Sequence, residues 1–280
     1  MRLTITCLFI LAFFAIGFHS CTSSPNSGIP FYLKVDSASL VTNYATQGAN
    51  TQNITDVWVQ AGTSNLGAYH MPCNFPVLQQ NDVFFVVNAG IEVSGLVGYR
   101  ETYPFYQIDT FTINATPGAK YTKNPVFKYN PAAIFTFKPI DFSFSSPFDT
   151  PMVAVNGVGP YGRCGEIPVT AGGDSNVVVQ QTTAYAVPTG VEVWLEVDYK
   201  CDVPFNIGFM ANYISNGNGT VEYPEMYVFA QPNWTKLYIS FTDDMSSAAA
   251  DNYNIYFEGL RPFGSKGGNI YVDNIKLIHF

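Results

Sequence analysis

The sequence predicts an all-β protein in which an N-terminal immunoglobulin-like β-sandwich is followed by a C-terminal jelly-roll β-sandwich. Three observations favour this class. Short runs rich in β-branched and aromatic residues recur along the chain, Gly/Pro-rich turns separate them, and helical periodicity is nearly absent after residue 28. A chain of 280 residues has room for about two domains.

The composition excludes two classes of protein before any motif is considered. Hydrophobic residues make up 47% of the chain, which excludes a disordered protein. Charged residues make up only 12%, and the net charge is −8. The chain therefore lacks the basic surface that a nucleic-acid partner requires.

Residues 1–20 are predicted to be a lipoprotein signal peptide. Arg2 precedes an apolar run at 8–16 that is too short to span a bilayer. The run ends at Gly17-Phe18-His19-Ser20-Cys21, which resembles a bacterial lipobox. This resemblance implies that Cys21 is lipidated, with 21–28 as a flexible tether on the outer membrane. It leaves the periplasmic and cell-surface faces undecided, and an ordinary secretory signal is the alternative.

The cysteines that remain after such processing are Cys73, Cys164 and Cys201. Cys164 and Cys201 lie in the same half of the chain, so they are the expected disulfide in an oxidising compartment. Three free thiols are the alternative. No CxxC spacing occurs, so a zinc or redox motif has no support.

The first sandwich is assigned to residues 29–130. In the run 55–60, Val57 and Val59 share one face and Asp56 and Trp58 share the other. A turn cluster at 62–65 leads to a partner strand, and this spacing of short strands is typical of an immunoglobulin-like sandwich.

The second sandwich is assigned to residues 131–280, because prolines near residue 130 end the first pattern. Residues 145–175 are Gly/Pro-rich and are expected to form an irregular functional insertion. A short helical turn is expected at 244–250. Jelly-roll strands are expected at 134–144, 176–187, 191–199, 205–214, 227–230, 234–241, 253–260 and 269–280.

Two resemblances agree with this division. The segments at 234–239 and 268–277 resemble the last strands of carbohydrate-binding-module jelly rolls. Segments at 56–59, 66–69, 75–78 and 103–106 resemble uncharacterised Bacteroidota lipoproteins that combine an immunoglobulin-like domain with a jelly roll. The second group implies an architecture and no activity.

A candidate binding face follows from the strand at 191–199. Its apolar residues alternate with Glu192, Trp194, Glu196 and Asp198, which therefore share one face. A sugar could stack on the indole and donate hydroxyl hydrogen bonds to the acids. A solvated strand face with Trp194 packed under a loop or a partner is one alternative, and a glycosidase acid/base pair of Glu192 and Glu196 is another. Trp58 repeats the pattern in the first domain, and Tyr238 and Tyr256 are further outward-facing candidates.

Other chemistry has less support. No G-x-S-x-G or HExxH motif accompanies the remaining histidines, so the protein is not expected to be an enzyme and no cofactor is expected. Asp273 and Asp141 match the positions at which jelly-roll modules often hold structural calcium; hydrogen bonding of Asp273 to a loop is the alternative. Asp36-Ser37-Ala38 matches a short Bacteroidota O-glycosylation pattern on Ser37.

The favoured function is a non-catalytic outer-membrane lipoprotein that acts as an accessory subunit of an outer-membrane complex for assembly, export or uptake. Its partner would be an outer-membrane β-barrel protein. The alternative is a glycan-binding lipoprotein for polysaccharide uptake or adhesion.

Overall fold

The computed structural model describes residues 28–173, 175–215 and 217–280, and these residues form an almost entirely β structure. The all-β prediction is confirmed. The predicted signal peptide at 1–20 and Cys21 lie outside the described residues, as does most of the predicted tether. Within the described ranges, no helix has the length and apolar character needed to cross a membrane.

The first domain is built from two layers of strands. One layer has the order β5-β1-β9, and the other has the order β4-β3-β6-β7 with β8 also paired to β6. Its elements are β1 (Phe31–Val35), β2 (Ser39–Val41), α2 (Tyr44–Gln47), β3 (Ile54–Ala61), β4 (Ser64–His70), β5 (Cys73–Val77), β6 (Asn81–Glu92), β7 (Arg100–Thr102), β8 (Asp109–Ala115), β9 (Lys120–Thr122) and β10 (Val126–Lys128). The more specific immunoglobulin-like assignment stays a prediction.

The second domain is also a two-layer sandwich. Its upper sheet has the order β12-β13-β20-β15-β18 with β11 paired to β20, and its lower sheet has the order β14-β19-β16-β17. Its elements are β11 (Ile134–Phe135), β12 (Val153–Gly159), β13 (Gly162–Thr170), β14 (Asn176–Gln180), β15 (Val193–Cys201), β16 (Phe205–Tyr213), β17 (Gly219–Val228), β18 (Gln231–Ser240), α3 (Thr242–Ala248), β19 (Asn252–Leu260) and β20 (Gly267–His279).

The irregular insertion expected at 145–175 is wrong. Most of this segment forms the β12–β13 hairpin, and β13 pairs with the last strand, β20. The Gly/Pro content misled the prediction because small residues here serve packing. A Cβ on Gly165 would lie 2.5 Å from the ring of Phe142, so glycine leaves space for that ring.

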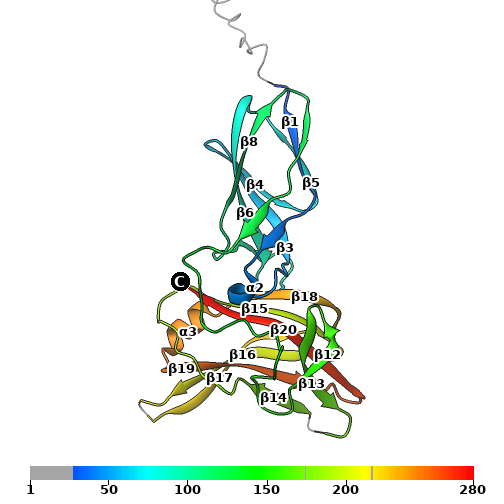
Figure 1. The fold of residues 1–280 in the computed structure, drawn as a ribbon, viewed down its shortest axis with the longest axis vertical. Coiled ribbons are helices and arrows are strands. Elements are labelled where there is room, and N and C mark those ends of the chain that lie inside the picture. The colour runs from blue at the N-terminus through cyan, green and yellow to red at the C-terminus, as the bar shows by residue number, and fades with distance from the viewer. Residues whose placement is uncertain (1–27, 174, 216) are drawn as a thin grey trace, which may run out of the picture.

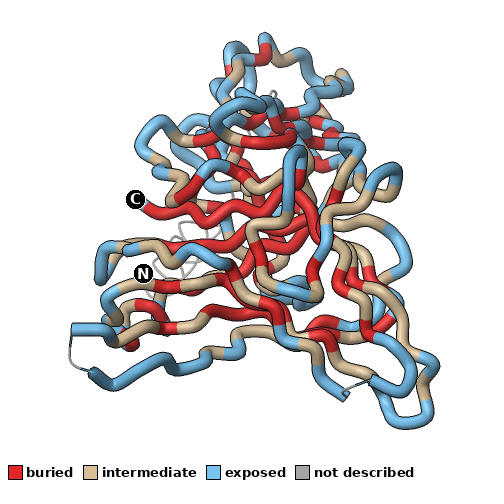
Figure 2. Tube along the Cα trace, turned by 60° about the horizontal axis from the view of Figure 1, so that its bottom comes forward, coloured by how far each residue is buried: buried red, intermediate tan, exposed pale blue. Residues whose placement is uncertain are grey.

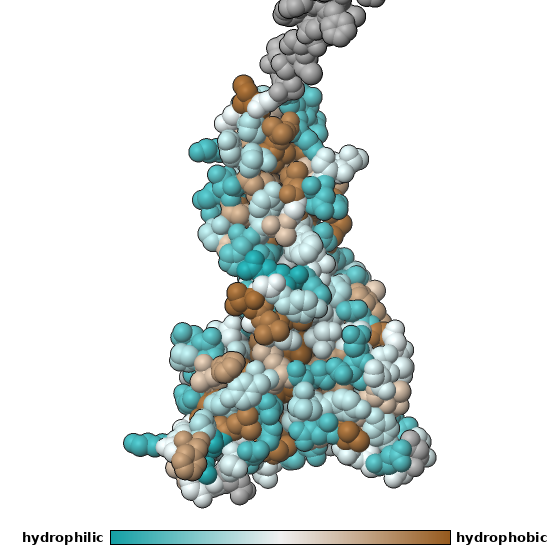
Figure 3. All heavy atoms as spheres, turned by 180° about the vertical axis from the view of Figure 1, so that it is seen from behind, coloured by the Kyte–Doolittle hydropathy of each residue, from teal (hydrophilic) through white to brown (hydrophobic). Residues whose placement is uncertain are grey.

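The two domains are stacked one on the other. In Figure 1 the first domain stands on the upper sheet of the second domain, while the lower sheet faces away from it. The buried stretches in Figure 2 follow the strands of both domains, and the exposed stretches gather in the loops. The surface in Figure 3 is mostly hydrophilic, with apolar side chains along the first domain and just below the narrow waist between the domains.

The lower sheet contains a close contact that requires glycine. A Cβ on Gly208 of β16 would lie 2.0 Å from the carbonyl oxygen of Tyr223 and 2.9 Å from the ring of Tyr256. The ring of Tyr256 therefore occupies the space above Gly208. The backbone contact leaves no flexible atom that could move aside.

We expect Gly208→Ala to lower the free energy of unfolding by about 1–3 kcal/mol, as overpacking does elsewhere. Urea denaturation measures the effect. Gly28→Ala is the matched control, because a Cβ there meets nothing within 4 Å. Equal stability of the two variants would contradict the packing shown here.

Candidate functional site: two faces of the second domain

The predicted face of β15 is real, but it is covered. Val193, Leu195 and Val197 point into the core of the second domain, as the alternation predicts. Trp194 instead belongs to the core cluster of the first domain, together with Tyr238 and Ile278. The first domain thus sits on the face that the sequence suggested for ligand binding.

Trp194 and Tyr238 are therefore not available to a ligand. Trp194 is only 2% exposed, its indole N–H donates to Glu192 at 2.7 Å, and its ring meets that of Tyr103 edge-on. The hydroxyl of Tyr238 lies 3.1 Å from that of Tyr106 and accepts from the backbone N–H of Asn53. The expectation of an open binding face here is wrong, because alternation shows which residues share a face and not what covers it.

Glu196 is the centre of a buried polar network at this junction. It is fully buried and accepts hydrogen bonds from the hydroxyls of Tyr103 and Tyr129 at 2.7–2.8 Å. Its carboxylate pairs with Lys236 at 2.9 Å and with Lys276 at 3.5 Å. The tyrosines belong to the first domain and the lysines to the strands on either side of β15, so one carboxylate joins both domains.

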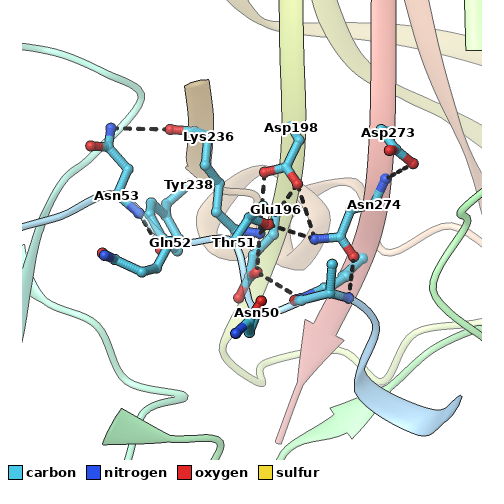
Figure 4. A network of polar contacts seen from close by, with 12 residues as sticks. Asn50, Thr51, Gln52, Asn53, Glu196, Asp198, Lys236, Tyr238, Asp273 and Asn274 are labelled. Carbon is cyan, nitrogen blue, oxygen red and sulfur yellow. Dashed lines mark hydrogen bonds and ion pairs between the residues drawn. The ribbon is translucent and has the colours of Figure 1, made fainter. Parts of the chain in front are cut away.

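A second carboxylate extends the network toward the segment that links β2 to β3. Asp198 accepts from the hydroxyl of Thr51 at 2.5 Å and from the side-chain amide of Asn274 at 3.1 Å. The oxygen of that Asn274 amide accepts the backbone N–H of Ala49. Figure 4 shows these contacts, with the 50–53 segment lying against β15, β18 and β20.

The contacts in this network shift the pKa values of Glu196 and Lys276 away from their ordinary values. Burial raises the pKa of Glu196, but Lys236 and Lys276 outweigh it and bring this pKa down to about 2. Burial and the neighbouring charge of Lys236 lower the pKa of Lys276 to about 7. A glycosidase carboxylate must reach the glycosidic bond, whereas Glu196 is fully buried beneath Tyr103 and Tyr129, so the acid/base reading of Glu196 is wrong.

Trp58 lies apart from this junction network. It is half-buried on β3, and a Cβ on Gly90 of β6 would lie 2.8 Å from its indole nitrogen. Asp56 on the same face is buried and accepts from Arg100 at 3.2 Å. The structure therefore does not bring Trp58 together with Trp194.

The two residues predicted to bind calcium, Asp273 and Asp141, make different hydrogen bonds. Asp273 is buried, accepts the backbone N–H of Asn274, and has its pKa raised by burial to about 8. Asp141 instead accepts from the hydroxyl of Tyr44 and the backbone N–H of Ser143. Among the residues described, no group of three or more His, Cys, Asp or Glu side chains could hold a metal. Calcium stays a prediction, as does glycosylation of the exposed Ser37.

The predicted disulfide between Cys164 and Cys201 is wrong, because both thiols are free and buried. Cys164 lies on β13 and Cys201 on β15, and β20 runs between these strands. Two strand spacings amount to about 10 Å, whereas disulfide-bonded Cα atoms lie about 4.4–6.8 Å apart. Burial raises the pKa of both thiols to about 11.

The lower sheet of the second domain carries a different polar face, which no domain covers (Figure 1). Its register places Val178, Glu258, Asn206 and Tyr227 in one row across β14, β19, β16 and β17. The side-chain amides of Asn176 and Asn206 each donate to one oxygen of Glu258 at 2.7 Å. Tyr227 beside them is 46% exposed. We call this row, together with Asn176, the open face.

A second amide cluster lies farther along the same side of the sheet. Asn212 donates to the side-chain oxygens of Asn252 and Asn254, and Thr220 donates to Asn212. Asn206 and Asn212 are six residues apart on β16, which corresponds to about 20 Å. Tyr256, a predicted candidate, lies between these clusters but is fully buried.

Sequence reasoning missed both the lysines of the junction and the amides of the open face. Lys276 stands between Ile275 and Leu277, and Lys236 is followed by Leu237, which is unusual in a chain with only 12% charged residues. That pattern could have indicated buried ion pairs. The asparagines of the open face gave no such signal, because asparagine is common in turns. Which asparagines meet across the sheet depends on the register of the strands, which the sequence does not reveal.

Comparisons with known proteins give fold likeness only. No protein-family model matches the sequence, and no curated protein matches it. A family 29 carbohydrate-binding module is 12% identical, with 53% of this chain and 87% of that chain covered and a TM-score of 0.34. A family 11 module of a Clostridium thermocellum cellulosomal cellulase is 21% identical, with 50% and 92% covered and a TM-score of 0.34. At these values the likeness carries no information on a ligand of this chain.

We expect Glu196→Gln to lower the free energy of unfolding at neutral pH by about 3–5 kcal/mol, because it leaves buried charge uncompensated. The pKa of about 2 in the folded state is below the ordinary 4.5, so the unfolded state binds more protons between these values. The parent protein should therefore lose this stability as the pH falls from 4.5 toward 2. Urea denaturation at several pH values measures it.

The exposed Glu222→Gln is the control for that experiment, since its carboxylate lies outside the junction. Its stability should follow the parent protein at every pH. The buried-pair account fails if Glu196→Gln loses as much stability on acidification as the parent protein does.

Lys276→Met tests the opposite end of the pH scale. The pKa of Lys276 is about 7 in the folded state against an ordinary 10.5, so the unfolded state binds more protons in this window. The parent protein should gain stability from this group between pH 7 and 10.5, and Lys276→Met should lack the gain. The exposed Lys266→Met is the control; parallel pH curves for all three proteins would refute the assignment.

Proposed function

We propose that this protein is a non-catalytic lipoprotein that binds carbohydrate through the open face of its second domain. The observation that carries the proposal is the clamped carboxylate of Glu258 beside the exposed ring of Tyr227. Carboxylate and amide groups accept and donate hydrogen bonds to sugar hydroxyls, while an aromatic ring offers an apolar surface to the C–H face of a sugar.

The arrangement is suited to a hydroxyl-rich ligand because it is held in place before binding. Two amide hydrogen bonds fix both oxygens of Glu258, which still has lone pairs free to accept from hydroxyls. A group that is already fixed loses less conformational entropy on binding. The roughly 20 Å between the two amide clusters favours an oligosaccharide over a single sugar.

The accessory-subunit reading was motivated by the irregular loop expected at 145–175 and by Trp194 and Trp58 on polar faces, and the structure removes the loop and the exposed Trp194. Trp194 is buried between the domains, and 153–159 and 162–170 form strands of the upper sheet. The glycan reading has lost its original face as well, but the lower sheet supplies another. The open face lies on the side of the molecule away from β1 (Figure 1), so a lipid anchor on Cys21 would leave it accessible.

Binding to a glycan array, followed by calorimetry with the best oligosaccharide, tests the proposal. We expect Tyr227→Ala and Asn206→Ala each to weaken binding about tenfold or more, which corresponds to about 1.4 kcal/mol. Tyr99→Ala is the matched control, because Tyr99 is similarly exposed but belongs to the first domain.

The Trp194→Phe variant distinguishes the role of the open face in binding from the role of the domain junction in stability. It should lower stability and leave the affinity of the folded protein unchanged. The proposal fails if the protein binds no oligosaccharide on the array, or if Tyr227→Ala and Tyr99→Ala bind equally well.

A further inference from the structure

A small cavity lies at the junction, away from the open face. Its volume is about 150 Å³, and its walls come from three parts of the chain. They are Thr51 and Gln52 of the linking segment, Pro160 of the β12–β13 turn, and Asp198, Trp234, Thr235 and Lys236 of the upper sheet.

Two side-chain contacts hold these walls together. The indole N–H of Trp234 donates to the backbone oxygen of Val158, which ties β18 to the β12–β13 hairpin. The hydroxyl of Tyr161 donates to Asn50, which ties the same hairpin to the linking segment. The cavity is therefore lined by parts of both domains, and Pro160 at its edge is exposed.

One wall carries a buried acceptor that lacks a donor. Asp198 is 2% exposed, and its Oδ2 accepts from Thr51 and Asn274, but its Oδ1 has no hydrogen-bond partner. The nearest cation is the ammonium of Lys236 at 3.6 Å, which already donates to Glu196 and Thr51. A buried acceptor without a donor is costly, so an occupant with a hydroxyl or N–H would be favoured.

The opposite charges of Asp198 and Lys236 restrict which molecule can occupy the cavity. A carboxylate would be repelled by Asp198, and an ammonium group would meet Lys236. A neutral hydroxyl can donate to Asp198 Oδ1 without either penalty. Trp234 and Pro160 add apolar walls against which the C–H face of a ring can pack.

From these features we infer that the cavity binds one neutral sugar ring or a polyol of that size. A volume of 150 Å³ corresponds to about five water molecules. This size matches one ring. This site does not depend on the open face, and it requires no oligosaccharide.

Titrations monitored by tryptophan fluorescence and ligand-observed NMR test the inference. The probes are glucose, galactose, mannose, N-acetylglucosamine and glycerol, with glucuronate and glucosamine as charged counterparts. We expect at least one neutral probe to bind and both charged counterparts to bind more weakly. Asp198→Asn and Trp234→Leu should each weaken that binding about tenfold or more.

Control variants separate the two sites. Asp202→Asn, an exposed change on the turn after β15, and Tyr227→Ala on the open face should both leave monosaccharide binding unchanged. If Asp198→Asn does not fold, crystals of the parent protein soaked in the best probe decide the question. Density for the probe in the cavity supports the site. Ordered water alone, or unchanged binding in Trp234→Leu, overturns it.

Discussion

The burial of Glu196 between two lysines and two tyrosines is the constraint on which the arrangement of the domains depends. A carboxylate with no exposure must have its charge compensated from several directions. The strands beside β15 supply Lys236 and Lys276, and the first domain supplies the hydroxyls of Tyr103 and Tyr129. Separating the domains would remove those hydroxyls and expose Trp194, so the junction has both a polar and an apolar component.

This constraint explains why one face of the second domain is unavailable to a ligand and the other is available. Both sheets carry polar side chains on their outer faces. On the upper sheet most of these groups bond to one another and to the first domain, although Asp198 Oδ1 has no donor. On the lower sheet they satisfy one another within the sheet and still face outward, as Glu258 does between Asn176 and Asn206.

Much of the fold could be predicted from the sequence, because the period of the side chains reveals strands. The division of Val193, Leu195 and Val197 from Trp194 and Glu196 across β15 was correct. The environment of Glu196 was not predictable, since it depends on Tyr103 and Tyr129, which are distant in sequence and reach it only after the domains pack. The same reason applies to Asn176, Asn206 and Glu258, which the register of three strands brings together.

The stacking of the domains has a mechanical consequence. The chain passes between the domains at 129–134, but this crossing is not the only connection, because the 48–53 segment and Tyr103 also contact the upper sheet. A pull on the lower sheet, resisted at residue 28, is therefore carried by several parallel hydrogen bonds and ion pairs. The molecule would transmit such a load as a stiff rod and would not swing about a single hinge.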